Sequence, residues 1–61
     1  MELKLLAYLI YRVFLDVEQV MEKFNVSNEE AQKLMHSLVL AGAASWSKDY
    51  KDTIFYNPDF V

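Results

Sequence analysis

Apolar residues between positions 17 and 41 recur at helical spacing in two separate sets. The first set shares one face of a helix and comprises Val17, Val20, Met21 and Phe24. The second set shares one face of a following helix and comprises Ala31, Leu34, Met35, Leu38 and Ala41. Neither helix can bury its apolar face alone, and only residues 25–27 separate the two sets. The pattern therefore predicts two helices that cross and pack on each other in a helix-turn-helix arrangement.

Capping signals mark the start of both predicted helices. Asp16 followed by Gln19, and Ser27 followed by Glu30, each have the form of a capping box. In such a box the first side chain accepts a hydrogen bond from a free N–H of the first turn, and the later side chain reaches back to the cap. The two boxes predict that the helices begin at about residues 17 and 28.

Residues that tolerate a left-handed backbone mark the ends of both helices. Asn25 adopts this conformation more readily than most residues and is placed to end the first helix. Gly42, the only glycine of the chain, is placed to end the second. Between the helices, Val26 is expected to point its apolar side chain inward at the corner. Caps, turn and periodicity therefore agree with one another.

Apolar residues crowd the first fifteen positions more densely than one helical face can hold. One stripe comprises Leu3, Leu6, Leu9 or Ile10, and Val13. A second stripe comprises Leu5, Tyr8, Tyr11 or Arg12, and Leu15. No breaker interrupts the segment, so we expect a helix that is buried on most of its circumference. Lys4 and Arg12 interrupt a run already shorter than the ~20 residues of a membrane span, and no small-residue cleavage site of a signal peptide follows.

The second apolar side of this first helix is expected to pack on another copy of the chain, because so small a domain has no further element to cover it. The residues expected at this homodimer interface are Leu5, Tyr8, Leu9 and Arg12. The alternative is a crowded intramolecular core with some exposed leucine, which is common in small proteins.

After Gly42 the pattern changes from helical spacing to alternation. Residues 43–47 and 53–57 alternate, the second of these segments is β-branched and aromatic, and residues 48–52 between them are polar. This predicts a β-hairpin with its tip near residues 48–52. Pro58 is expected to end the second strand because it cannot donate a hydrogen bond to the ladder.

Aromatic residues of the hairpin are expected to form its core. Trp46 is expected to pair across the strands with Phe55 or with Tyr56, depending on the register. A short extended bridge is expected at residues 14–16, and residues 60 and 61 are expected to fold back onto the domain.

Length and composition allow a single domain over residues 1–61 with a core of marginal size. Hydrophobic residues make up 54% of the chain, so we expect it to fold. The chain has no cysteine, which excludes disulfides and thiolate metal sites and favours a reducing, cytoplasmic location. The one histidine has no suitably spaced carboxylates for a zinc site. We expect no metal and no cofactor.

The predicted order is helix, short strand, helix, helix and β-hairpin, in a mainly α fold. At this point the chain resembles the winged-helix family of small transcription regulators. The resemblance is carried by the stretch VEQVMEKFNVSNEEAQKLMHSLVLAG and the following ASW, and covers nearly the whole chain. Its marker positions are Val26, Ser27, Met35, Leu38 and Gly42.

The resemblance implies that the third helix enters the major groove of double-stranded DNA and that the hairpin, or wing, contacts the adjacent backbone. The residues that it places at the DNA are Ser27, Asn28, Gln32, Lys33, His36, Ser37, Lys48, Tyr50 and Lys51. Asn and Gln amides can bond bidentately to adenine, and Lys can reach guanine or phosphate. A helix N-terminus, with its free N–H groups, can hold a phosphate.

The charge distribution supports this implication only in part. The whole chain carries a net charge of −3, the wrong sign for a nucleic-acid binder. Residues 31–51 carry +2, because Lys33, Lys48 and Lys51 outnumber Asp49. In contrast, residues 28–40 and the hairpin contain no arginine, and the third helix opens with the two carboxylates of residues 29 and 30.

Two functions follow as expectations. The first is a small dimeric winged-helix DNA-binding protein that regulates transcription. The alternative is a winged-helix module that binds protein within a transcription or replication assembly and makes no direct DNA contact. An enzyme is not expected, because the sequence has no nucleophile-base motif, no Gly-rich phosphate loop and no paired carboxylates in an apolar setting.

Overall fold

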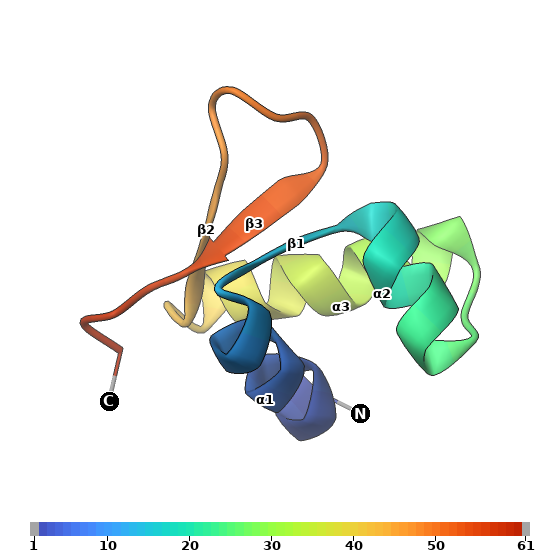
Figure 1. Ribbon diagram of the computed structural model, residues 1–61, viewed down its shortest axis with the longest axis horizontal. Helices are drawn as coiled ribbons and strands as arrows, with labels where there is room; N and C mark the ends of the chain where they lie inside the picture. The colour runs from blue at the N-terminus through green and yellow to red at the C-terminus, as the bar shows by residue number, and fades with distance from the viewer. Residues whose placement is uncertain (1, 61) are drawn as a thin grey trace.

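Three helices and a three-stranded antiparallel sheet make up the computed structural model, which describes residues 2–60 (Figure 1). The helices are α1 (Glu2–Arg12), α2 (Val17–Phe24) and α3 (Asn28–Leu40). The strands are β1 (Phe14–Asp16), β2 (Ala44–Trp46) and β3 (Thr53–Tyr56). This is the predicted order of elements, and the short extended bridge at residues 14–16 is confirmed as β1.

The predicted starts of α2 and α3 are confirmed, although only one capping box closes completely. The Asp16 carboxylate accepts a hydrogen bond from the Gln19 N–H at 2.8 Å, and the Gln19 side-chain oxygen accepts one from the Asp16 N–H at 3.0 Å. At α3 the Ser27 hydroxyl accepts a hydrogen bond from the Glu30 N–H at 3.2 Å. The Glu30 carboxylate does not return the contact, so Ser27 acts as a simple N-cap.

The predicted ends of both helices are confirmed as well. Asn25 is left-handed, with φ of 54°, and directly follows α2. Gly42 has φ of 83°, and its N–H donates to the Val39 carbonyl at 3.0 Å. The next N–H, of Ala43, donates to the Leu38 carbonyl at 3.0 Å. This pair of bonds is a Schellman motif, which satisfies carbonyls that the end of α3 would otherwise leave free.

The first helix ends at Arg12, before the bridge that the sequence predicts at residues 14–16. Val13 has φ of 75°, a backbone conformation that β-branched residues rarely adopt. Its carbonyl accepts a hydrogen bond from the Tyr56 N–H at 2.8 Å, so the turn is held by the sheet. Pairing with β3, a contact distant in sequence, therefore ends the helix where local propensity would continue it.

The sheet has the strand order β1-β3-β2, with both pairs antiparallel. Trp46 lies opposite Ile54, so the expected pairing of Trp46 with Phe55 or Tyr56 is wrong. Phe55 instead lies between Phe14 and Ser45 on the outer face of the sheet, and its ring is 6.0 Å from that of Phe14. Both Phe55 and Trp46 stay partly exposed, so neither belongs to the buried core.

The core lies between α1, α2, α3 and the inner face of the sheet. Its fully or almost fully buried apolar residues are Leu5, Leu9, Leu15, Val17, Val20, Ala31, Leu34, Met35, Leu38, Ala43, Ala44 and Ile54. Val26 packs against this core at the corner between α2 and α3, as predicted. Phe60 also packs against it, and its carbonyl accepts a hydrogen bond from the Tyr56 hydroxyl at 3.3 Å. The expected return of the chain end is thus confirmed for Phe60, while Val61 lies outside the described residues.

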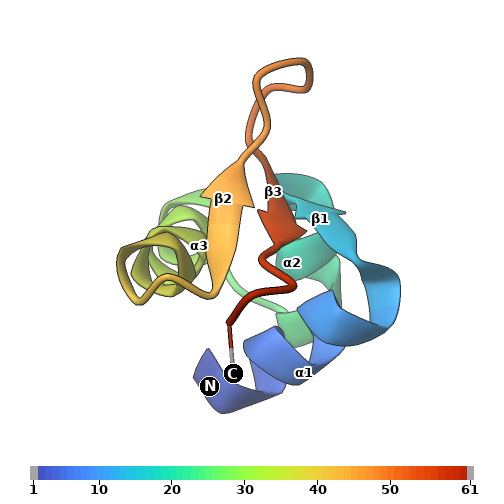
Figure 2. The same cartoon turned by 90° about the vertical axis from the view of Figure 1, so that its left-hand side faces the viewer.

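The hairpin tip and α1 lie at opposite ends of the molecule, and α3 lies at the side (Figure 2). Each helix therefore presents its outward face in a different direction. Within residues 2–60, no helix combines the length and the apolar character that crossing a bilayer demands.

Candidate functional site

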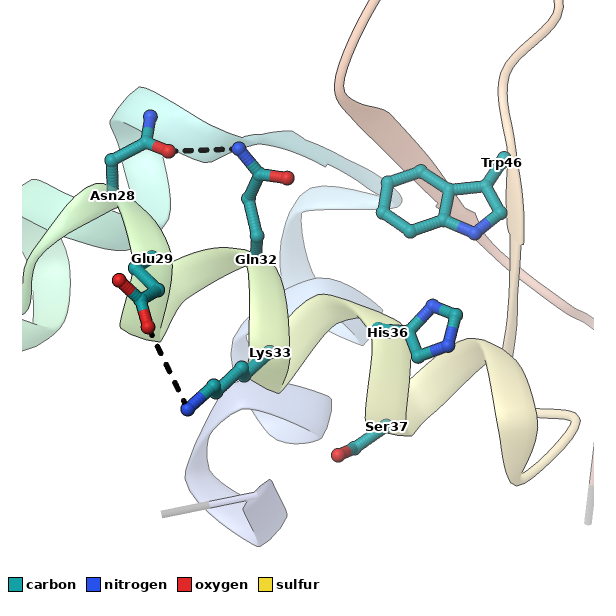
Figure 3. A pocket seen from close by; sticks show the side chains of 7 residues that line it. All are labelled: Asn28, Glu29, Gln32, Lys33, His36, Ser37 and Trp46. Atoms are coloured by element: carbon teal, nitrogen blue, oxygen red, sulfur yellow. Dashed lines mark hydrogen bonds and ion pairs between the residues drawn. The ribbon is translucent and has the colours of Figure 1, made fainter.

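An open groove of about 670 Å³ runs along the outward face of α3 and ends at Trp46 on β2 (Figure 3). Its lining residues are Asn28, Glu29, Gln32, Lys33, His36, Ser37 and Trp46. Five of the nine residues that the sequence places at DNA are among them. The structure therefore brings together one continuous set of polar side chains along α3 from Asn28 to Ser37.

The groove faces outward because the opposite side of α3 is buried. Ala31, Leu34, Met35 and Leu38 all lie in the core and recur at helical spacing. Positions between them must then point away from the core, which fixes the direction of the polar side chains. The helix that carries this face begins after the N-cap Ser27 and ends at the Schellman motif.

Two side-chain pairs stand side by side at the first half of the groove (Figure 3). The Gln32 amide nitrogen donates a hydrogen bond to the Asn28 side-chain oxygen at 2.7 Å. The Lys33 ammonium lies 3.8 Å from a Glu29 carboxylate oxygen, and both side chains are mostly exposed. An exposed pair of this kind is worth at most about 1 kcal/mol, so a ligand can separate it at little cost. The hydrogen bond between the two amides is exposed as well.

Trp46 and His36 form the other end of the groove. Their ring centroids are 6.5 Å apart with planes tilted by 34°, and 40% of Trp46 is exposed. Sequence reasoning assigned Trp46 to the hairpin core and missed it as a groove residue. The alternation of β2 does place Trp46 on the core side, opposite the fully buried Ile54. Because β2 is an edge strand, however, the indole reaches past the core and over α3, and no local signal shows which strand is at the edge.

The hairpin tip carries the other predicted contacts and lies apart from the groove. The Ser47 hydroxyl accepts hydrogen bonds from the N–H groups of Asp49 and Tyr50, at 3.1 and 3.0 Å, and so organises the turn. Lys48, Tyr50 and Lys51 are all exposed there, and none of them lines the groove. A ligand of the size of a duplex would have to contact both regions at once.

A second depression, of about 440 Å³, lies on the outer face of the sheet. Its lining residues are Phe14, Asp16, Tyr50, Thr53 and Phe55. Tyr50 therefore borders this face and not the face of α3. The exposed aromatic pair Phe14 and Phe55 was not recognised from the sequence, because the strand register that joins them is a long-range property.

Two of the four residues expected at a dimer interface are buried within the single chain. Leu5 and Leu9 have no exposed surface and pack in the core, so the expectation that they contact a second copy is wrong. Tyr8 packs edge-on against Phe24 at 6.3 Å, with the Lys23 ammonium 5.0 Å from its ring centre.

The remaining member, Arg12, is exposed at the end of α1 and shares a shallow depression with Tyr8 and Gln19. The side of α1 that was expected at the homodimer interface is thus the side that in fact packs against the other helices and the sheet. Both stripes of α1 are similarly apolar, so periodicity alone does not distinguish the core side from the free side.

Charged and histidine side chains do not gather into a metal site. Within the described part of the chain, no three His, Asp or Glu residues lie close enough together to hold an ion. Every buried side-chain nitrogen or oxygen described there has a hydrogen-bond partner, so no unpaired polar atom marks an additional site.

Comparison of the chain with protein-family models, with curated proteins and with solved structures finds no match. The groove along α3, the hairpin and the exposed face of α1 are the three surfaces available for binding a partner.

Proposed function

We propose that the chain is a winged-helix DNA-binding protein, in which α3 enters the major groove and the hairpin contacts the adjacent backbone. The observation that carries this proposal is the continuous polar face of α3. It runs from Asn28 to Ser37, is lined by amide, carboxylate, ammonium, imidazole and hydroxyl groups, and is bordered by the hairpin strand β2. The width of a major groove admits a single α-helix presented in this way.

The chemistry of the face suits the reading of base edges. The amides of Asn28 and Gln32 each carry a donor and an acceptor, and such amides bond bidentately to adenine. Lys33 follows on the same face and can donate to guanine or to a phosphate. The bond between Asn28 and Gln32 places both amides side by side on the outer side of the helix.

Three lysines favour binding to a polyanion in this region, although the whole chain is acidic. Residues 31–51 carry a net charge of +2, but the carboxylates of Glu29 and Glu30 precede them on α3 and offset it. Lys48 and Lys51 extend this charge onto the exposed hairpin tip. When Lys33 exchanges its exposed contact with Glu29 for a phosphate, the loss is small and the released counterions favour binding.

Glu29 and Glu30 oppose the proposal, and their position gives them a structural role. They occupy the first turn of α3, where negative side chains stabilise the helix dipole. In a complex their carboxylates repel phosphates, except where one accepts a hydrogen bond from the N4 amino group of cytosine. The proposal therefore predicts modest affinity for random sequences and a preference for sites that offer such a partner.

Fluorescence anisotropy of labelled duplex DNA, measured over a range of salt concentrations, tests the proposal. We expect binding that weakens steeply as salt rises, because each phosphate contact releases counterions. Replacing Lys33, Lys48 or Lys51 by Ala should each flatten the slope of log affinity against log salt by roughly 0.9. Lys23→Ala is the matched control, since Lys23 is an exposed lysine on α2, away from both the α3 groove and the hairpin tip. No binding at low salt, or an equal effect of Lys23→Ala, would contradict the proposal.

A protein-binding module is the second candidate, favoured by the acidic first turn of α3 and by the exposed apolar side chains of α1. Leu3, Ile10 and Tyr11 are large and apolar, and each is exposed by 47% or more. If duplex DNA fails to bind at any salt concentration, the groove and hairpin lose their role as a nucleic-acid surface. The α1 face would then be the main interaction site of the chain.

A further inference from the structure

One side of α1 carries an apolar stripe that the rest of the protein does not cover. Leu3, Leu6, Ala7 and Ile10 follow the spacing i, i+3, i+4 and i+7, which places them on one face of the helix. Leu3 is 82% exposed and Ile10 47%, Ala7 is exposed, and Leu6 is half-buried at the border of the core. This outer stripe lies on the side of α1 away from the buried Leu5 and Leu9.

The area of the outer stripe reaches the lower limit for a specific interface. Together with the neighbouring Tyr11, which is 81% exposed, it presents roughly 500 Å², about a tenth of the 4360 Å² surface of the protein. Two such faces in contact would bury about 1,000 Å², which is the lower limit for a specific association. Burying Leu and Ile side chains there stabilises the pair by the hydrophobic effect.

We propose that the outer stripe is the interface of a homodimer in which two α1 helices pack antiparallel about a twofold axis. The argument for a second copy as the occupant is that the stripe is complementary to itself. With the axis between residues 6 and 7, Leu3 of one copy faces Ile10 of the other, and Leu6 faces Ala7. The large Leu6 thus meets the small Ala7 at the centre, and Leu3 meets Ile10 at each end. Each contact occurs twice, once on either side of the axis, as in every isologous interface.

The flanks of the outer stripe agree with this arrangement. Lys4 and Tyr11 lie on the same border of the stripe, since they are seven residues apart on α1. Antiparallel pairing places Lys4 of one copy beside Tyr11 of the other, where an ammonium is attracted to an aromatic ring. Residues 3–12 contain no carboxylate, so this part of the paired helices brings no negative charges together.

The position of α1 leaves the proposed DNA-binding regions free. It lies at the end of the molecule opposite the hairpin tip (Figure 2). The side of α3 that faces α1 is buried in the core, so the polar face of α3 points away from α1. Dimerisation is thus independent of whether the groove binds DNA, and each proposal can fail without the other.

Sedimentation velocity, from low micromolar to several hundred micromolar protein, tests the dimer. The parent chain should sediment as a species of twice 7.2 kDa at the higher concentrations. Leu3→Glu and Ile10→Glu should each weaken dimerisation at least tenfold, because each places a carboxylate in the apolar contact. Leu40→Glu is the matched control, since Leu40 is 76% exposed on α3 and away from the stripe. A monomer at every concentration, or a dimer that tolerates both α1 variants, would overturn the proposal.

Disulfide cross-linking tests the antiparallel orientation and does not depend on the folding of charged variants. The chain has no cysteine, so each introduced thiol is the only one present. Ala7→Cys lies beside the twofold axis and should form a covalent dimer under oxidation. Leu3→Cys should not link to itself, because its counterpart is about 10 Å away along the helices, but it should link when mixed with Ile10→Cys. Self-linking of Leu3→Cys, or no linking of Ala7→Cys, would rule out this pairing.

Discussion

The outward faces of α1 and α3 differ in chemistry although both helices bury their inner faces in the same core. The face of α3 is polar, and its side chains pair with one another through Asn28–Gln32 and Glu29–Lys33. The face of α1 is apolar over Leu3 and Ile10. Paired polar groups are stable in water and can exchange partners, which suits a surface that meets a hydrated, charged ligand. An apolar stripe gains free energy only when it is covered, which suits a lasting contact with another protein.

Within α1 alone, some residues stabilise the fold and others are available to contact another molecule. Leu9 and Ile10 are adjacent in the sequence, but Leu9 is fully buried and Ile10 is about half exposed. Their positions assign one side of α1 to the core and the other to the surface. A substitution at each position therefore probes a different property of the molecule.

The largest expected effect distinguishes the two sides of α1. Leu9→Ala should lower the free energy of unfolding by about 3 kcal/mol, because it removes buried methyl groups and leaves a cavity. Ile10→Ala should change it by less than about 0.5 kcal/mol in protein dilute enough to dissociate the proposed dimer. Urea denaturation followed by Trp46 fluorescence or circular dichroism measures both. Equal losses at the two positions would show that the core side of α1 is assigned wrongly.

A smaller effect is expected at the residue that ends α3 and so limits its polar face. Gly42→Ala should destabilise the protein by about 1 kcal/mol, because a Cβ is strained at φ of 83°. An added Cβ would meet no atom within 4 Å, so the cost comes from the backbone and not from a clash. Thermal unfolding of the parent chain and the variant checks the expectation, and a neutral Gly42→Ala would contradict it.

Loss of the N-cap of α3 should lower the free energy of unfolding about as much as Gly42→Ala does, or slightly less. Ser27→Ala removes the acceptor of the Glu30 N–H and should cost about 0.5–1 kcal/mol. Asp16→Ala should cost more, because it breaks a box in which both reciprocal bonds are formed. Ser27→Asp and Asp16→Asn keep an acceptor at each cap and should restore most of the loss. Chemical denaturation that finds Ser27→Ala more damaging than Asp16→Ala would disprove this ranking.

The smallest expected effect concerns the charge of the α3 face. Glu29→Gln should tighten binding to random duplex DNA roughly threefold at low salt, since it removes a charge that repels phosphate and frees Lys33. Glu22→Gln, at an exposed carboxylate on α2, is the control for the change in net charge. Anisotropy titrations measure both. If the two variants behave alike, total charge and not the α3 face governs binding.

Most local features of the fold were predictable because the interactions that produce them span only a few residues. The Asp16 and Ser27 caps, the left-handed Asn25 and Gly42, and the buried spacing of α3 all follow from neighbours within one or two helical turns. The outward polar residues of α3 were predictable for the same reason, since burial of one face fixes the other.

Other features were decided only by the tertiary structure, because they depend on contacts between segments that are distant in the sequence. Pairing with β3 ends α1 at Arg12 and holds Val13 at a positive φ. The register of β3 places Ile54 opposite Trp46, and the edge position of β2 extends the indole into the α3 groove.

The sequence by itself determined where α2 and α3 begin and end and which way α3 faces, because hydrogen bonds and spacing within a few residues specify them. Which apolar stripe of α1 enters the core was decided only by packing, which buries Leu5 and Leu9 and leaves Leu3 and Ile10 outside. Two stripes of similar hydrophobicity gain similar free energy from burial. The choice between them therefore depends on the shape of the surface that α2, α3 and the sheet offer.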